Sequence, residues 1–454
     1  MTGTETEPDR APADALPDAH PRLALGRIAL ASGAGTALEF YDFSLYATAT
    51  ALVFNQVFFI VKDPWFGTFI GFATFAIGYF MAPLGAILFG HLGDRIGRRR
   101  SLVLSFTVMG LATLVMGLLP DARMIGVTAP VLLLLLRLVH GVSRGGEVGG
   151  AALLAIEHAP NGKRGLYGSF VALGSPVGAG LATLAFMLLL NGMGMNAIVA
   201  GGWRIPFLAG GVLIFVGLIT RLTIDETPVF LQLRSEQKLE KRPLLAVLRE
   251  NWRRVLLAAG VNLGFNAFTF VLFSFLLSYG SEPPSAHGLG IDRNTLVLAT
   301  LIGCVLHAAT ILAASLLADR FGAKRIMLIG GVLLGAWAYP MMLMFRTADP
   351  TLASLAMIIG FAFGGLFFGP MLTLFAHLFT PAQRYSGIGI GYQVGAALGG
   401  GISPLIANRL IAATGSPLSV SAYLTIIMAL SILCLALLPD AYHPRRPVTA
   451  TTAD

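Results

Sequence analysis

The chain has 454 residues, of which 56% are hydrophobic and only 12% are charged, and its mean hydropathy is +0.77. A soluble domain carries about 25% charged residues, so this composition excludes an ordinary soluble protein and indicates a polytopic membrane protein. The formal net charge of +8 has to be interpreted from the position of the basic residues relative to the membrane.

The first 26 residues are rich in Pro, Ala, Asp and Glu, and they predict a disordered cytoplasmic tail without the pattern of a signal peptide. Beyond this tail, twelve apolar windows are each long enough to cross a bilayer core of ~30 Å as a helix. The predicted fold is therefore all-α, with twelve transmembrane helices. The windows lie near residues 27–56, 66–90, 101–119, 130–158, 165–190, 202–222, 253–279, 295–317, 325–345, 351–378, 385–412 and 418–438.

The basic residues indicate how these helices are oriented. Of the 31 Lys and Arg, 23 fall in the two tails and the alternate loops on their side, six fall in the opposite loops, and two lie within the membrane. Because short cytoplasmic loops carry an excess of Lys and Arg, both termini are predicted to be cytoplasmic. The positive charge then reflects topology, and nucleic-acid binding is not expected.

Two loops of the chain repeat one motif. Residues 90–100, after the second window, read GHLGDRIGRRR, and residues 315–325, after the eighth, read SLLADRFGAKR. Asp94 and Asp319 are 225 positions apart, which is about half the chain. A repeat at this spacing predicts two related six-helix halves.

The predicted halves are residues 27–222 and 253–438, with a cytoplasmic linker at 223–252 and a cytoplasmic tail at 439–454. In each loop, Asp can accept hydrogen bonds from the N-terminus of a neighbouring helix, and Arg can pair with another helix. The alternative is that the basic residues of these loops only keep the loops on the cytoplasmic side of the membrane. The residues predicted to form a cytoplasmic gate are Asp94, Arg95, Arg98, Asp319, Arg320 and Lys324.

The fourth window contains ionisable residues where hydrocarbon is expected. At helical pitch, Arg137, His140, Arg144 and Glu147 fall within roughly 80° of one another, so they form one polar stripe. A charged side chain deep in a bilayer costs at least ~2.5 kcal/mol, so such residues face a bundle interior or a wet cavity. We therefore expect this helix to line a cavity.

Further motifs occur along most of the chain. They are LEFYDFSLY at 38–46, PLGAILFG at 83–90, GGEVGGA at 145–151, WRIPF at 203–207, ETPVF at 226–230 and RYSG at 384–387. With these motifs and the repeated loop, the chain resembles the major facilitator superfamily, and more narrowly its metabolite:proton symporter branch. The resemblance implies two pseudo-symmetric bundles that rock about a central site, with the first, fourth, seventh and tenth spans lining it. It also implies that small polar metabolites move inward with protons.

If the first and fourth spans adjoin one cavity, as the resemblance implies, their ionisable residues can form a charge network. A carboxylate that loses its cationic partner in a low-dielectric site gains proton affinity, and it releases the proton when the partner returns. We expect Glu39 or Asp42 to carry the proton, and Arg137 to hold the unloaded acid ionised. Glu147 belongs to the same family motif. The alternative is a permanent structural salt bridge between the two spans.

Arg144 departs from the family pattern, which usually has a small or aliphatic residue there. Its guanidinium stays charged and can bind a carboxylate through two hydrogen bonds, so it favours an anionic organic acid as substrate. The competing interpretation makes Arg144 the partner of Glu147, three residues away on the same helix. The other residues predicted to bind substrate are His140, Tyr46, Asn262 and Asn266, although membrane asparagines often only link helices.

No nucleotide, metal or nucleophile motif appears, and Cys304 and Cys434 lie in apolar runs. We therefore expect neither an enzyme nor a cofactor or metal site. The sequence predicts a monomeric, multi-pass transporter of the bacterial inner membrane that imports a mono-, di- or tricarboxylate with protons. The alternatives are a symporter of zwitterionic osmolytes such as proline or betaine, a sensor on the same fold, and a drug or metabolite exporter.

Overall fold

A computed structural model of the chain describes residues 23–59, 64–160, 162–222, 226, 228–236, 243–284 and 288–440. These residues form helices joined by short turns, and no strand occurs among them. The predicted tail at 1–26 lies outside the described residues except for its last four, which already belong to the first helix. Of the predicted tail at 439–454, residues 441–454 lie outside as well.

The N-terminal half contains six membrane-spanning segments, several of which are interrupted by a π-helical turn or a break. Their helices are α1 (Leu23–Ala49) with η1 (Thr50–Phe54) and α2 (Asn55–Val57), α3 (Pro64–Ile96), α4 (Arg98–Leu118), α5 (Ala122–Ile125), α6 (Thr128–Arg144) with α7 (Glu147–Glu157), α8 (Arg164–Ala197) with η2 (Ile198–Gly202), and α9 (Arg204–Leu222). Two short helices, α10 (Pro228–Ser235) and α11 (Pro243–Glu250), occupy the linker.

The C-terminal half repeats this order of six segments. Its helices are α12 (Trp252–Phe270) with η3 (Val271–Phe275) and α13 (Leu276–Ser281), α14 (Arg293–Phe321), α15 (Ala323–Arg346), α16 (Pro350–Phe368) with α17 (Met371–Leu378), α18 (Arg384–Ala396) with η5 (Ala397–Gly401) and α19 (Ser403–Thr414), and α20 (Leu418–Leu437).

Nine helical segments within the described residues are long and apolar enough to cross a membrane. The three remaining predicted windows coincide with α1, with α6 and α7, and with α9. The predicted all-α fold of twelve transmembrane helices is therefore confirmed. One detail differs, because the fourth span is not a single helix but breaks at Gly145 and Gly146.

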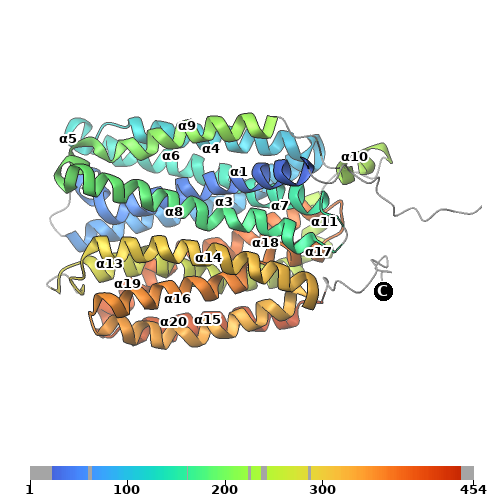
Figure 1. Cartoon of the computed structure of the whole chain (residues 1–454). Coiled ribbons are helices and arrows are strands. Elements are labelled where there is room, and N and C mark those ends of the chain that lie inside the picture. The colour runs from blue at the N-terminus through green and yellow to red at the C-terminus, as the bar shows by residue number, and fades with distance from the viewer. Residues whose placement is uncertain are drawn as a thin grey trace, which may run out of the picture.

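The axes of the helices are roughly parallel, and the two halves lie side by side (Figure 1). Helices α5 and α13 mark one end of the molecule, and α10, α11 and α17 mark the other, which we call the motif end. Gly97 and Gly322 form the corresponding turns of the two repeated loops there, with φ of 114° and 94°. A side chain rarely adopts these angles, so the repeated glycine permits the same tight turn twice.

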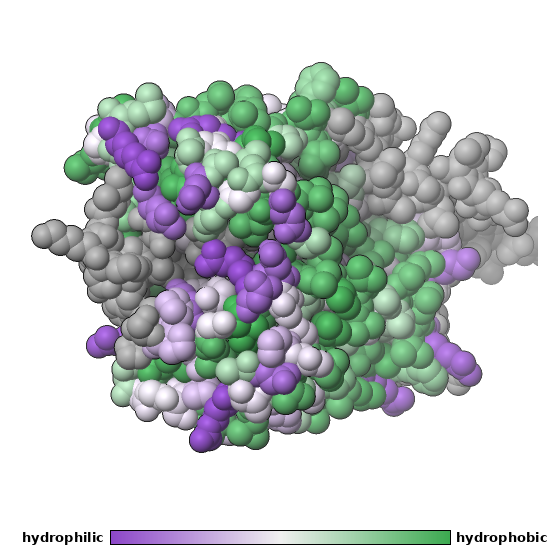
Figure 2. Space-filling view, turned by 60° about the vertical axis from the view of Figure 1, so that its left-hand side comes forward, coloured by the Kyte–Doolittle hydropathy of each residue, from purple (hydrophilic) through white to green (hydrophobic). Residues whose placement is uncertain are grey.

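The flank of the molecule is covered largely by hydrophobic side chains, whereas hydrophilic ones gather on the end that comes forward in Figure 2. Exposed apolar residues on this surface come from helices of both halves. This distribution is the one expected of a protein whose flank contacts lipid. Examples are Leu111, Val212, Val305 and Ile426.

Close helix packing inside the N-terminal half depends on glycine. A Cβ atom at Gly85 of α3 would overlap the backbone carbonyl of Val142 on α6, and one at Gly178 of α8 would overlap that of Ala37 on α1. Small residues let backbones approach in this way, which gives close packing in a membrane where the hydrophobic effect between helices is absent. The contacts fix α6 beside α3 and α1 beside α8.

Candidate substrate and coupling site

The break in the fourth span places the polar stripe at the centre of the N-terminal half. Arg137, His140 and Arg144 lie in the last two turns of α6, and each is at most 1% exposed. Glu147 opens α7 and is equally buried. A Cβ at Gly145 would overlap the backbone of α3, so glycine at the break lets the fourth span press against the second.

Arg144 forms an ion pair with the first span. Its Nε donates to Oε1 of Glu39 over 2.8 Å, and both side chains are excluded from solvent. The ion pair of Arg144 therefore joins α6 to α1, so the acid that it contacts lies on another span from Glu147. Arg144 also stacks against the rings of Phe43 and Tyr79, with its Cζ 4.4 and 4.5 Å from the ring centroids.

Arg137 lies about two turns away on α6 and has no such acid partner among the described residues. Its Cζ is 3.7 Å from the centroid of the Tyr46 ring and 5.2 and 5.9 Å from those of Phe43 and Phe75. None of its three side-chain nitrogens has a hydrogen-bond partner within the part of the chain that the structure describes. Tyr46 itself is fixed, because its hydroxyl shares a hydrogen bond of 3.1 Å with that of Thr74.

Asp42 and His140 form the remaining part of the cluster. Thr113 donates to Oδ2 of Asp42 over 2.9 Å, and Nε2 of His140 lies 3.8 Å from the same oxygen. Oδ1 of Asp42 and both ring nitrogens of His140 lack a hydrogen-bond partner among the described residues. Buried polar atoms are normally paired, so these atoms have hydrogen-bonding capacity that the described residues leave unused.

Aromatic rings connect this cluster to the C-terminal half. Phe270 of α12 packs against Phe43, Phe75 and Tyr79, with ring centroids 5.8, 5.6 and 5.1 Å apart. Gln393 of α18 also donates to the backbone carbonyl of Arg144, over 3.5 Å. The charged cluster therefore lies at the interface between the halves, and hydropathy did not single out these aromatic residues because they are typical of any span.

The two asparagines predicted to bind substrate form hydrogen bonds within the protein in this structure. Asn262 donates to the backbone carbonyl of Tyr392 over 2.6 Å and so links α12 to α18. Asn266 donates to the backbone and side-chain oxygens of Asn262, over 3.0 and 2.7 Å. Both are buried, and in this state their amide donors are occupied within the C-terminal half.

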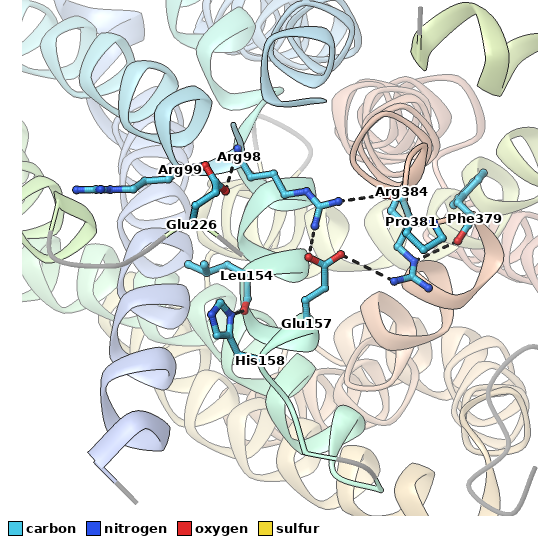
Figure 3. A network of polar contacts seen from close by, with 9 residues as sticks. All are labelled: Arg98, Arg99, Leu154, Glu157, His158, Glu226, Phe379, Pro381 and Arg384. Carbon is cyan, nitrogen blue, oxygen red and sulfur yellow. Dashed lines mark hydrogen bonds and ion pairs between the residues drawn. The ribbon is translucent and has the colours of Figure 1, made fainter. Parts of the chain in front are cut away.

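At the motif end, buried charges of the first loop reach the other half (Figure 3). Arg98 forms an ion pair with Glu157 of α7 and donates from Nη2 to the carbonyl of Pro381 over 3.1 Å. Arg384 of α18 lies 3.8 Å from the other oxygen of Glu157. The side chain of Glu226 accepts from the backbone N–H of Arg98 over 3.1 Å, so the linker caps the start of α4.

The two repeated aspartates make equivalent contacts across the halves. Asp94 accepts a hydrogen bond of 2.8 Å from the hydroxyl of Ser386, at the start of α18. Asp319 accepts from the backbone N–H groups of Gly165 and Leu166, at the start of α8, over 2.7 and 2.9 Å. Each carboxylate therefore lies at the N-terminus of a helix in the opposite half, where the helix dipole favours negative charge.

Not every predicted gate residue lies between the halves. Lys324 donates to the carbonyls of Ala436 and Leu438, over 2.8 and 2.5 Å, and so caps the end of α20 in its own half. In this respect Lys324 differs from Asp94 and Asp319, whose contacts reach the opposite half. Arg95 and Arg320 are exposed at the surface of the motif end.

Comparison with known proteins identifies the chain's family. A family model described as Sugar (and other) transporter matches residues 28–259, and one described as Major Facilitator Superfamily matches residues 282–453. The chain belongs to the major facilitator superfamily, in its sugar-transporter-like family. As a member, it is a secondary transporter and a multi-pass protein of the inner membrane, not an enzyme.

Relatives and solved structures resemble this transporter over nearly its whole length. The inner membrane metabolite transport protein YhjE of Escherichia coli is 37% identical, with 92% of this chain and 94% of the relative covered. The shikimate transporter of the same organism is 35% identical over 91% and 94%. The proton:xylose symporter XylE has the same fold, with a TM-score of 0.71 at 18% identity over 91% and 94%.

Proposed function

We propose that this transporter moves a small mono-, di- or tricarboxylate into the cell together with one or more protons. The observation that carries the proposal is the guanidinium of Arg137, which is fully buried and has no hydrogen-bond acceptor among the described residues. Arg keeps its charge in proteins and presents its donors in a planar fork that matches a carboxylate. A substrate carboxylate would supply both the missing acceptors and the opposite charge.

The sequence predicts that Arg137 holds the unloaded acid and that Arg144 binds the substrate. In this proposal the two arginines exchange these roles. Arg144 holds the carboxylate of Glu39, so it is the residue that keeps an unloaded acid ionised. Arg137 is left to receive the substrate. Each hydrogen bond to a charged group contributes about 1.5–3 kcal/mol, so a bidentate contact with Arg137 is a large part of the binding energy of a small anion.

The coupling to protons follows from the position of Glu39 and Arg144 in one half. Rocking of rigid halves does not separate two residues of the same half, so the pair has to be opened by a change at the pair itself. A proton on Glu39 would remove its charge and release Arg144, which then joins Arg137 in binding the anion. In this scheme the loaded transporter carries substrate and proton together, and Asp42 beside His140 is a second proton position.

We infer that the motif end faces the cytoplasm, because 23 of the 31 Lys and Arg belong to that side. The contacts that join the halves there, such as Arg98 with the carbonyl of Pro381 and Arg384 with Glu157, would then close the site toward the cytoplasm. Opening toward the cytoplasm requires these contacts to break. During import, the binding of substrate and proton would then be coupled to the breaking of these contacts.

The proposal can be tested by uptake of radiolabelled compounds into proteoliposomes that contain the purified transporter. The panel contains lactate, succinate and citrate, with betaine, proline and xylose as compounds of other classes. We expect uptake of at least one carboxylate, at a rate that rises when the external pH is lowered. Uptake of betaine, proline or xylose with none of any carboxylate would overturn the proposal.

A further inference from the structure

His307 of α14 is a buried polar residue that the proposed mechanism does not use. It is only 3% exposed and lies at the middle residue of α14, which spans Arg293–Phe321. The rings of Phe265, Phe361 and Phe368 surround it, with centroids 6.4, 6.2 and 6.5 Å away. Its Nε2 has no hydrogen-bond partner within the described part of the chain.

The hydrogen bond of the other ring nitrogen determines which nitrogen of His307 carries the hydrogen. Nδ1 lies 2.8 Å from the backbone carbonyl oxygen of Phe361 on α16. A carbonyl oxygen can only accept, so Nδ1 must carry the hydrogen of this bond. In the neutral ring Nε2 is then a hydrogen-bond acceptor. The protein therefore holds one unpaired acceptor at mid-depth, where a buried polar atom without a partner is costly.

His307 lies one helical turn from the interface between the halves. Three residues before it on α14, Cys304 faces Gly180 of α8, and a Cβ at Gly180 would lie 3.5 Å from that of Cys304. Helix α14 therefore meets the N-terminal half within one turn of His307, while the ring itself packs among residues of α12 and α16. Arg137 lies beside Gly78 in the middle of α3, where a Cβ would be 3.0 Å from its Nη2.

We propose that Nε2 of His307 accepts a hydrogen bond from a hydroxyl group of the substrate, so that the transporter selects a hydroxylated carboxylate. The inference rests on the proposed function, because it assigns the carboxylate to Arg137 and the hydroxyl to His307. The N-terminal half then supplies the donors and the C-terminal half the acceptor. A substrate that forms hydrogen bonds with both halves at once stabilises the state in which the halves close around it.

The inference is tested by uptake into proteoliposomes of matched pairs that differ in one hydroxyl: lactate with propionate, malate with succinate, and citrate with tricarballylate. His307→Asn keeps a donor to the Phe361 carbonyl but has no atom at the position of Nε2. His307→Gln restores a polar atom there. One neutral hydrogen bond corresponds to about a two- to tenfold change in KM.

For wild type we expect a lower KM for the hydroxylated member of the transported pair. His307→Asn should raise that KM about two- to tenfold and leave the unhydroxylated member unchanged, and His307→Gln should recover part of the preference. Equal KM changes for both members in His307→Asn would overturn the inference and leave the proposed function intact. Loss of proton-driven accumulation for both members, with exchange retained, would instead make His307 a proton site. Transport of none of the six acids by wild type overturns both proposals.

Discussion

Arg144 on α6 and Glu39 on α1 form a hydrogen-bonded ion pair of 2.8 Å inside the membrane, and both side chains are excluded from solvent. Removing one partner of a buried ion pair leaves an uncompensated charge and costs about 3–5 kcal/mol. Arg137, seven residues earlier on the same helix, has aromatic rings against its guanidinium and no hydrogen-bond partner for it among the described residues. The two arginines are equally buried but should respond differently to substitution.

This difference gives a prediction for stability. Arg144→Gln leaves Glu39 without its cation, so we expect a destabilisation of about 3–5 kcal/mol, seen as a clear fall in the apparent melting temperature of the purified protein. Arg137→Gln loses only cation–π contacts, of about 0.5–2 kcal/mol, and removes an unpaired charge. The double variant Glu39→Gln/Arg144→Gln should recover part of the loss. Equal falls for the two single arginine variants would contradict this assignment.

Transport by the Arg137 variants tests the substrate site separately. Arg137→Lys keeps the charge but loses the planar fork, and Arg137→Gln loses both, so we expect KM for the transported carboxylate to rise in that order. The rise for Arg137→Gln should be about tenfold or more, since a charged hydrogen bond contributes about 1.5–3 kcal/mol. Unchanged KM in both variants would show that Arg137 does not contact the anion.

Glu39→Gln mimics the protonated acid and therefore tests the coupling. We expect this variant to exchange internal for external substrate but to lose accumulation driven by a pH gradient, because it can no longer release the proton. Asp42→Asn is the matched comparison, with a smaller effect expected. The measurement compares counterflow with gradient-driven uptake in the same proteoliposomes. Retained accumulation in Glu39→Gln would exclude Glu39 as the proton carrier.

At the motif end, Glu157→Gln removes the charge that both Arg98 and Arg384 approach. We expect this end to open more often, so that a cysteine at Ala86, in the contact between α3 and α18, reacts several-fold faster with a maleimide. Cys304 and Cys434 are replaced by Ser in this background. Glu236→Gln, at an exposed position just after α10, is the control and should leave the rate unchanged. The same rate in Glu157→Gln would exclude the gate role.

Glycine packing in the N-terminal half gives a further prediction for stability. Gly85→Ala places a methyl group against the carbonyl of Val142, and overpacking of this kind costs about 1–3 kcal/mol. Gly192→Ala is the matched control, because no atom lies within 4 Å of its Cβ position. We expect a lower apparent melting temperature for the first variant only. Equal melting temperatures would show that α3 and α6 can move apart at no cost.

The sequence predicts the fold well because the bilayer imposes one strong rule, that each crossing is a helix of about 20 apolar residues. It also predicts that Asp94 and Asp319 accept hydrogen bonds from helix N-termini and that Arg98 pairs with another helix, because the repeat makes a shared role visible. It does not indicate which half that helix belongs to. The partner of Arg144 could not be predicted, since Glu39 and Glu147 are both within reach of a long side chain. The choice between them depends on how the first and fourth spans pack together, which the sequence does not state.

Other differences have the same origin. Asn262 and Asn266 carry amides suited either to a ligand or to a neighbouring helix, and a single sequence does not state which helix lies opposite. Lys324 belongs to the repeated motif, but α20 ends beside it and offers two carbonyls. Contacts between helices depend on rotation about each helix axis, which hydropathy along the chain does not encode.

The central claim is that a proton enters with the carboxylate through Glu39. It is tested most directly with a pH-sensitive dye inside proteoliposomes, to which the transported acid is added outside under an inward proton gradient. Protein-free liposomes correct for diffusion of the uncharged acid. We expect substrate-dependent acidification of the interior in wild type and its loss in Glu39→Gln. Uptake of the carboxylate by wild type without acidification would contradict the account.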